Sequence, residues 1–231
     1  MINWKKSGKM EKFNFSLNVV ILTTLIIAFW ISVYKQNWTE ILPIILTFTL
    51  LLIPHFLEKK YKIDFPTEFE IAIAIIIYCS LFLGEYTGAY QTFWWWDSFL
   101  HAFSGLTLGL AAFLTMYLFY KTEKIKAKPI TIAIIAFSFA LSIGALWEIA
   151  EFTIDYTTGM DMQRARNLCE IGTEICDTRL GVMDTMKDLI VDSIGALIAS
   201  IIGFIYLKTG EIHFIENIIR KTIRTNKRFF K

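Results

Sequence analysis

The sequence predicts an all-α, polytopic integral membrane protein with about six transmembrane helices and both termini in the cytoplasm. Apolar residues make up 55% of the 231 residues, and the mean hydropathy is +0.50, whereas a soluble domain is about 45–50% apolar. The apolar residues are concentrated in long blocks, and the basic residues gather between alternate blocks. Together these observations indicate a chain that crosses a membrane several times.

Six apolar blocks account for the predicted helices. They cover residues 15–34, 41–57, 69–87, 98–120, 129–154 and 182–207. A helix rises about 1.5 Å per residue, so about 20 apolar residues cross a hydrocarbon core of about 30 Å. The first block follows a lysine-rich start, as in a signal peptide, but its length and the lack of a small-residue cleavage site favour a retained anchor.

The distribution of lysine and arginine predicts the orientation of the helices. With the N-terminus inside the cell, the cytoplasmic segments hold 18 of the 23 basic residues. These segments are residues 1–14, 59–62, 121–128 and 208–231. Because segments rich in lysine and arginine stay in the cytoplasm, we expect a multipass protein of the cell (cytoplasmic or inner) membrane.

Two regions are predicted along the chain. Residues 1–210 would form the six-helix transmembrane domain, and residues 211–231 a basic amphipathic cytoplasmic tail. Ile215, Ile218 and Ile219 recur at helical spacing among lysines and arginines, which favours a helix on the inner membrane surface. A frayed, solvated tail is the alternative. The net charge of only +2 does not favour a nucleic-acid partner, so membrane lipids are the expected partners.

Seven ionisable residues in the last three predicted helices, at 97–120, 129–155 and 182–207, are candidate site residues. They are Asp97, His101, Glu148, Glu151, Asp184, Asp188 and Asp192. Residues three or four positions apart share a helix face, and a charged group that faces lipid costs about 2.5–3.5 kcal/mol. We therefore expect these side chains to converge in one water-accessible cavity that opens to the extracytoplasmic side.

Small residues continue the same three helix faces. They are Gly105 and Gly109 in the first helix, Ala140 and Gly144 in the second, and Gly195, Ala199 and Gly203 in the third. Small residues spaced by four let transmembrane helices approach closely. The pattern predicts three helices that pack together directly beside their polar residues.

The polar residues favour a metal site. One imidazole with several carboxylates suits Mn, Fe, Zn or Mg, and all seven residues are candidate ligands. Because a bound divalent ion activates water, we expect His101, Glu148 and Asp188 to be the catalytic candidates of an intramembrane enzyme. Its substrate would be a lipid, a lipid-like molecule or a cell-envelope precursor.

Other functions remain compatible with these residues. A transporter or a cation or proton pathway also uses intramembrane carboxylates and histidine. A non-catalytic scaffold or envelope-stress factor would use the polar groups only to fix the helix register. Asp97 could serve solely as a helix N-cap, and Glu151 and Asp184 could be solvated helix ends. The tryptophans at 94–96 are typical of an aromatic belt at the membrane interface.

Two cysteines, Cys169 and Cys176, lie in the long loop that is predicted outside the cell. In an oxidising compartment they would form a short disulfide loop. Two free thiols, or a metal site completed by other groups, are the alternatives.

Three motifs, "WWWDSFLHAFSG", "ALWEIAEF" and "DTMKDLIVDSIGA", resemble the YjdF-like family of bacterial and archaeal inner-membrane proteins, a domain of unknown function. They are also similar to the VanZ-like pattern D-x3-H, E-x2-Q and D-x3-N-x2-G. The residues that match this pattern are Asp97, His101, Glu148, Asp188 and Gly195. Glu151 and Asp192 stand where glutamine and asparagine are usual. The resemblance covers about residues 94–203 and implies a polar site at the matching positions.

Reporter fusions test the predicted orientation. After residue 128 or residue 231, a fused fluorescent protein should be fluorescent and a fused alkaline phosphatase inactive, because the basic segments keep these points in the cytoplasm. Within residues 160–178 the opposite is expected, so that an inserted alkaline phosphatase is active and an inserted fluorescent protein is not. Alkaline phosphatase and fluorescent-protein activities measure the two cases. An exported C-terminus would reverse the orientation and put the polar residues on the cytoplasmic side.

Overall fold

The computed structural model describes residues 8–62, 64–164 and 180–227, and all regular elements in these ranges are helical. Six helices there are long and apolar enough to cross a membrane. Their spans are Lys9–Tyr34, Trp38–Tyr61, Thr67–Tyr86, Trp96–Lys121, Pro129–Thr158 and Gly181–Thr209. This confirms the predicted all-α membrane architecture. The cytoplasmic placement of both termini stays a prediction.

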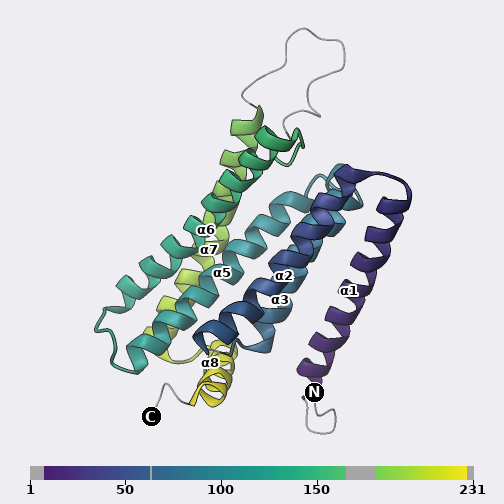
Figure 1. Ribbon diagram of the computed structural model, residues 1–231. Helices are drawn as coiled ribbons and strands as arrows, with labels where there is room; N and C mark the ends of the chain where they lie inside the picture. Colours follow the sequence, from purple (N-terminus) through teal and green to yellow (C-terminus); the bar gives the residue numbers. More distant parts are fainter. Residues whose placement is uncertain (1–7, 63, 165–179, 228–231) are drawn as a thin grey trace. The chain divides into compact units, whose positions relative to one another are not determined.

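The spans correspond to the labelled helices of Figure 1. The elements are α1 (Lys9–Tyr34), η1 (Trp38–Glu40), α2 (Ile41–Tyr61), α3 (Thr67–Ile77), η2 (Tyr78–Tyr86), α4 (Ala89–Thr92), α5 (Trp96–Lys121), α6 (Pro129–Thr158), α7 (Leu180–Thr209) and α8 (His213–Thr225). Large apolar side chains lie on the outer surface, for example Trp30 at 65% exposure and Ile149 at 59%. A surface of this kind is stable in contact with lipid and unfavourable in water.

The chain divides into two compact units. The first comprises Met1–Trp96 and Glu211–Lys231, and the second comprises Asp97–Gly210. Each unit has its own packed interior. The predicted polar residues all belong to the second unit, so the first is described only briefly.

The first unit is built from α1, α2 and the continuous helix formed by α3 and η2. Its buried core includes Leu25 of α1, Ile44 of α2 and Phe82 of η2. The backbone of η2 is a π-helix, a form with i→i+5 hydrogen bonds that is rare over such a length. The rings of Tyr78, Phe82 and Tyr86 stack along it, with centroids 4.9 and 5.0 Å apart.

The predicted tail contains the helix α8, which is fastened to the start of α3. Lys221 Nζ lies 3.0 Å from both carboxylate oxygens of Glu68. The side-chain amide of Asn226 donates to the Asp64 carbonyl at 2.8 Å and accepts from the Asp64 N–H at 2.9 Å. The apolar positions of α8 are buried, as for Ile218. Helical spacing in the tail is therefore observed, and a location on the inner membrane surface stays a prediction.

The second unit consists of α5, α6 and α7, which lie side by side in Figure 1. Glycines set their spacing. A Cβ atom at Gly105 would collide with the backbone carbonyl of Asp192, and one at Gly195 would collide with that of Ala102. A Cβ at Gly109 would lie 2.6 Å from the Cβ of Ala199. The predicted small-residue faces are therefore the surfaces through which these helices touch.

The C-terminus of α6 is capped by a left-handed glycine and a buried carboxylate. Gly159, at φ 76°, takes the left-handed conformation that ends the helix, which glycine adopts without strain. The buried carboxylate of Asp155 then accepts from the N–H groups of Met162 and Gln163, at 2.7 and 2.9 Å. Asp155 thereby fixes the chain just beyond the helix. The predicted disulfide partners Cys169 and Cys176 lie outside the described residues.

Two glycine substitutions measure how closely α5 and α7 pack. At Gly195 an added methyl meets the backbone of Ala102, whereas at Gly203 it meets the ring of Phe113. A ring can rotate away but a backbone carbonyl cannot, so Gly195→Ala should lower the free energy of unfolding by about 1–3 kcal/mol. Gly203→Ala should cost less. Denaturation in detergent micelles measures both. Equal, small effects would contradict the close approach of the two backbones.

Candidate polar site on α5, α6 and α7

Four of the predicted carboxylates surround the imidazole of His101. Asp97 is four residues before His101 on α5, Glu148 comes from α6, and Asp188 and Asp192 come from α7. The spacing of four puts each pair on one helix face, and the glycine contacts bring the three faces together. The sequence predicted that seven residues converge, and five of them lie in this cluster, whereas the water-accessible cavity stays a prediction. Their roles as ligands or catalysts stay predictions.

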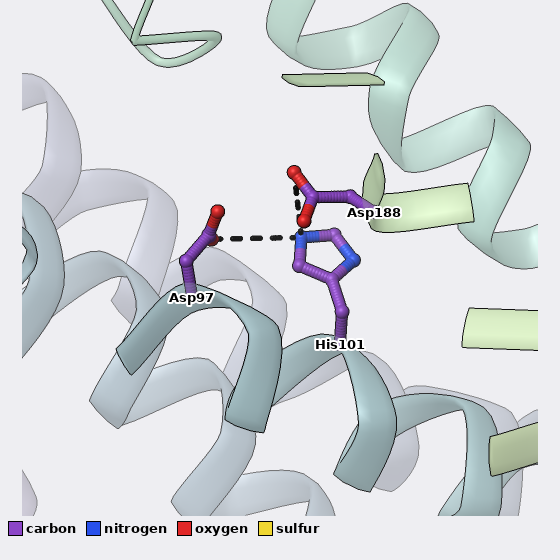
Figure 2. A group of neighbouring side chains, drawn as sticks. All are labelled: Asp97, His101 and Asp188. Carbon is purple, nitrogen blue, oxygen red and sulfur yellow. Dashed lines mark ion pairs between the residues drawn. The ribbon is translucent and has the colours of Figure 1, made fainter. Parts of the chain in front are cut away.

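The carboxylates divide between the two ring nitrogens. His101 Nε2 lies 3.7 Å from Asp97 Oδ1, 3.9 Å from Glu148 Oε1 and 4.0 Å from Asp188 Oδ2. Nδ1 lies 3.3 Å from Asp192 Oδ2. Only the contact at Nδ1 is short enough for a hydrogen bond. Figure 2 shows Asp97 and Asp188 both directed towards the same nitrogen of the ring.

Asp192 is the best satisfied of these acids. Its Oδ2 contacts the ring, and its Oδ1 accepts a hydrogen bond from Ser104 Oγ at 3.1 Å. Ser104 lies one turn after His101, and its Oγ is also 2.9 Å from the His101 carbonyl, so its single hydroxyl hydrogen is shared between the two acceptors. Ser104 therefore joins the two residues from the α5 side.

Glu148 has the opposite character. Its side chain is 3% exposed, and neither carboxylate oxygen has a partner at ordinary hydrogen-bond geometry among the described residues, although the Thr185 side chain lies near enough for a weak, long contact. Asp188 is 2% exposed, and its Oδ1 also lacks such a partner there. Buried polar atoms are nearly always hydrogen-bonded, and burying them without a partner costs free energy. The unsatisfied atoms lie on the Nε2 side of the ring.

One lysine approaches the cluster from its open side. Lys187 Nζ lies 3.6 Å from Asp97 Oδ2 and 3.6 Å from Asp188 Oδ1. Its side chain is 48% exposed, whereas that of Asp97 is 13% exposed. The ammonium thus partly neutralises two of the carboxylates from the edge of the cluster and does not reach hydrogen-bond distance of either.

Glu151 and Asp184 lie beside the cluster but make no ion pair with His101 in the part of the chain that is described. Glu151 is buried and close enough to Glu148 to interact electrostatically. Asp184 is half-buried and interacts in the same way with Asp188. They lie near the site without contacting its centre.

Three of the clustered residues have the spacing of metal ligands. One ligand atom from each of Asp97, His101 and Asp188 can be chosen so that all three lie within 4.8 Å of one another. Two ligands bound at about 2.1 Å are roughly 3–4.2 Å apart, depending on the angle between the bonds. A divalent ion could therefore be held here after a small inward movement of the side chains.

Sequence reasoning did not identify the residues that hold Asp192. Gly144 lies against its carboxylate so closely that a Cβ atom there would collide with Oδ2. Because Gly144 lies one turn before Glu148 on α6, the sequence could predict that α6 packs closely against another helix at this point. The contact with a site carboxylate depends on the rotation of α7 about its axis, which the sequence does not specify.

Comparison with known proteins agrees with the predicted resemblance. A protein-family model described as "Predicted membrane protein (DUF2238)" matches residues 17–209. An "Uncharacterized protein" of Thermotoga maritima is 27% identical over 146 residues, a match that covers 62% of this chain and 65% of that protein. No solved structure matches the chain.

The family match includes all the residues that contact His101 in the structure. It confirms the resemblance to a YjdF-like membrane domain of unknown function, whereas the VanZ-like pattern stays a prediction. The chain belongs to the DUF2238 family of predicted membrane proteins.

Proposed function

We propose that the Nε2 side of the His101 cluster binds a divalent metal ion and that this ion supports hydrolysis of a lipid or cell-envelope precursor. The observation that carries the proposal is Glu148, which is 3% exposed and has two carboxylate oxygens without a hydrogen-bond partner among the described residues. A cation beside such a carboxylate would offset the cost of burying its charge, and the His101 nitrogen beside it is itself a ligand atom.

The donor atoms favour particular metals. Asp97 and Asp188 supply carboxylate oxygen, and His101 supplies one imidazole nitrogen. This mixture suits Mn, Fe or Zn, whereas Mg is usually bound by oxygen and water alone. Glu148 would act as a further ligand or as the base that takes a proton from water.

A bound ion of this kind would make a coordinated water acidic enough to attack an ester or phosphoester. The hydroxyl of water would join the attacked carbon or phosphorus atom, and the proton held by Glu148 would pass to the leaving oxygen. The substrate class follows from the surroundings, because the helices that carry the site face lipid. An extracytoplasmic location rests on the positive-inside prediction.

A purely structural role fits these contacts less well. A polar network that only fixes helix register would satisfy its own buried groups, whereas Glu148 and Asp188 keep unpartnered oxygens. A conducting path is also less favoured. In the described part of α6 and α7 the residues beyond the cluster include Ala140, Ala196 and Ala199, each at most 1% exposed. The buried polar groups that follow on α5 and α7 among the described residues are the isolated hydroxyls of Thr107 and Ser200, which do not form a continuous row of ionisable groups.

Elemental analysis tests the metal directly. Purified wild-type protein should hold about one transition-metal ion per chain, or take one up when Mn²⁺ or Zn²⁺ is added. His101→Ala and Asp188→Asn should lose it, because each removes a ligand atom. Glu123→Gln is the matched control, since Glu123 is an exposed acid in the same unit. Failure of the wild type to bind either ion would contradict the proposal.

Glu148→Gln separates function from stability. An amide costs less to bury than an unpartnered carboxylate, so the variant should raise the free energy of unfolding of metal-free protein by about 1–3 kcal/mol. The same variant should bind metal more weakly. Glu123→Gln should change stability by no more than about 0.5 kcal/mol. A loss of stability in Glu148→Gln would instead indicate a structural role for this residue.

A further inference from the structure

The two nitrogens of His101 have different surroundings, and the difference determines where its proton lies. Nδ1 is 3.3 Å from Asp192 Oδ2. With Asp192 ionised, its carboxylate only accepts hydrogen bonds, so this contact favours the tautomer that carries the proton on Nδ1. The three carboxylate oxygens near Nε2 lie 3.7–4.0 Å away, which is too far for hydrogen bonds. In the neutral ring, Nε2 then keeps its lone pair.

The carboxylate of Asp192 is held in this position from three directions. Ser104 Oγ donates to its Oδ1 at 3.1 Å. Gly144 of α6 leaves just enough space for Oδ2, since a Cβ atom there would collide with it. Gly105 of α5 packs against the Asp192 backbone carbonyl. The side chain is 2% exposed, so little freedom of rotation remains.

We infer that Asp192 is a positioning residue that fixes His101 as its Nδ1–H tautomer, and that Gly144 is the residue that holds Asp192 in place. The inference rests on the proposed function, because the purpose of this tautomer is to direct the Nε2 lone pair at a metal ion. Hydrogen bonds from ligand histidines to carboxylates orient the ring and increase its basicity. Asp192 would therefore support the metal through His101, while Asp97 and Asp188 bind it directly.

The inference extends to metal selectivity. Ions that bind well to imidazole nitrogen, such as Zn²⁺ and Fe²⁺, gain from an oriented Nε2, whereas Mg²⁺ and Ca²⁺ depend on oxygen ligands. Disturbing Asp192 should weaken binding of the first group more than binding of the second. A change that merely loosened the helices would weaken both groups alike.

Four variants of the protein distinguish a positioning role of Asp192 from a general effect on helix packing. Asp192→Ala removes the acceptor, and Asp192→Asn keeps an oxygen that can accept from Nδ1. Gly144→Ala pushes the carboxylate away without changing any charge. Gly109→Ala is its matched control, because it inserts the same methyl into a helix contact, 2.6 Å from Ala199, away from the polar residues.

The first measurement is ¹⁵N NMR of histidine-labelled, metal-free protein at alkaline pH. The chain has three histidines, so His101 is assigned by its absence in His101→Gln. Wild type, Asp192→Asn and Gly109→Ala should show the Nδ1–H tautomer. Asp192→Ala and Gly144→Ala should lose this preference. An Nε2–H tautomer in the wild type, or no change in Asp192→Ala, would overturn the inference.

The second measurement is the affinity for Zn²⁺, with Mg²⁺ as the comparison ion. Asp192→Ala and Gly144→Ala should bind Zn²⁺ about 10–100-fold more weakly, and Gly109→Ala should bind as the wild type does. If Gly144→Ala shows the same tautomer and the same Zn²⁺ affinity as Gly109→Ala, the role of Gly144 is overturned. If the wild type binds no metal, the proposed function fails, whereas the NMR result still decides the role of Asp192. If Gly144→Ala does not fold, the comparison of Asp192→Ala with Asp192→Asn still decides whether Asp192 positions the ring.

Discussion

The polar cluster depends on how closely α5, α6 and α7 approach one another. Gly105 and Gly195 let the backbones of α5 and α7 meet, and Gly144 leaves room for a carboxylate beside α6. Wider spacing between any two of these helices would remove one side chain from the reach of His101. In a membrane, helix association relies on packing and on hydrogen bonds between helices, because lipid offers no hydrophobic gain. Close packing and the polar contacts therefore support each other in this unit.

The acids around His101 are satisfied unevenly, and the pattern is informative. Asp192 has Ser104 and the ring as partners, while Glu148 has none among the described residues. Both are equally deep, at 2% and 3% exposure. Burial alone thus does not explain the difference. The unsatisfied oxygens gather around Nε2, where a ligand would complete them, and the satisfied ones lie around Nδ1, where a ligand is not needed.

Much of the architecture could be predicted because long apolar blocks are a local signal. The spacing of four between Asp97 and His101, and between Asp188 and Asp192, correctly predicted shared helix faces. The division of the acids between Nδ1 and Nε2 could not be predicted, because it depends on the rotation of each helix about its axis. The π-helix η2 was also missed, because the apolar pattern predicts a helix without distinguishing i→i+5 from i→i+4 hydrogen bonding.

Lys187 affects the charge balance of the polar cluster. Its ammonium is shared between Asp97 and Asp188, two of the residues with metal-ligand spacing. The chain therefore carries a tethered counterion, which lowers the repulsion among the acids while the helices assemble. The oxygens nearest His101 Nε2 are the other two, Asp97 Oδ1 and Asp188 Oδ2, so the ammonium does not occupy them and stays at the edge of the cluster as a fixed positive charge.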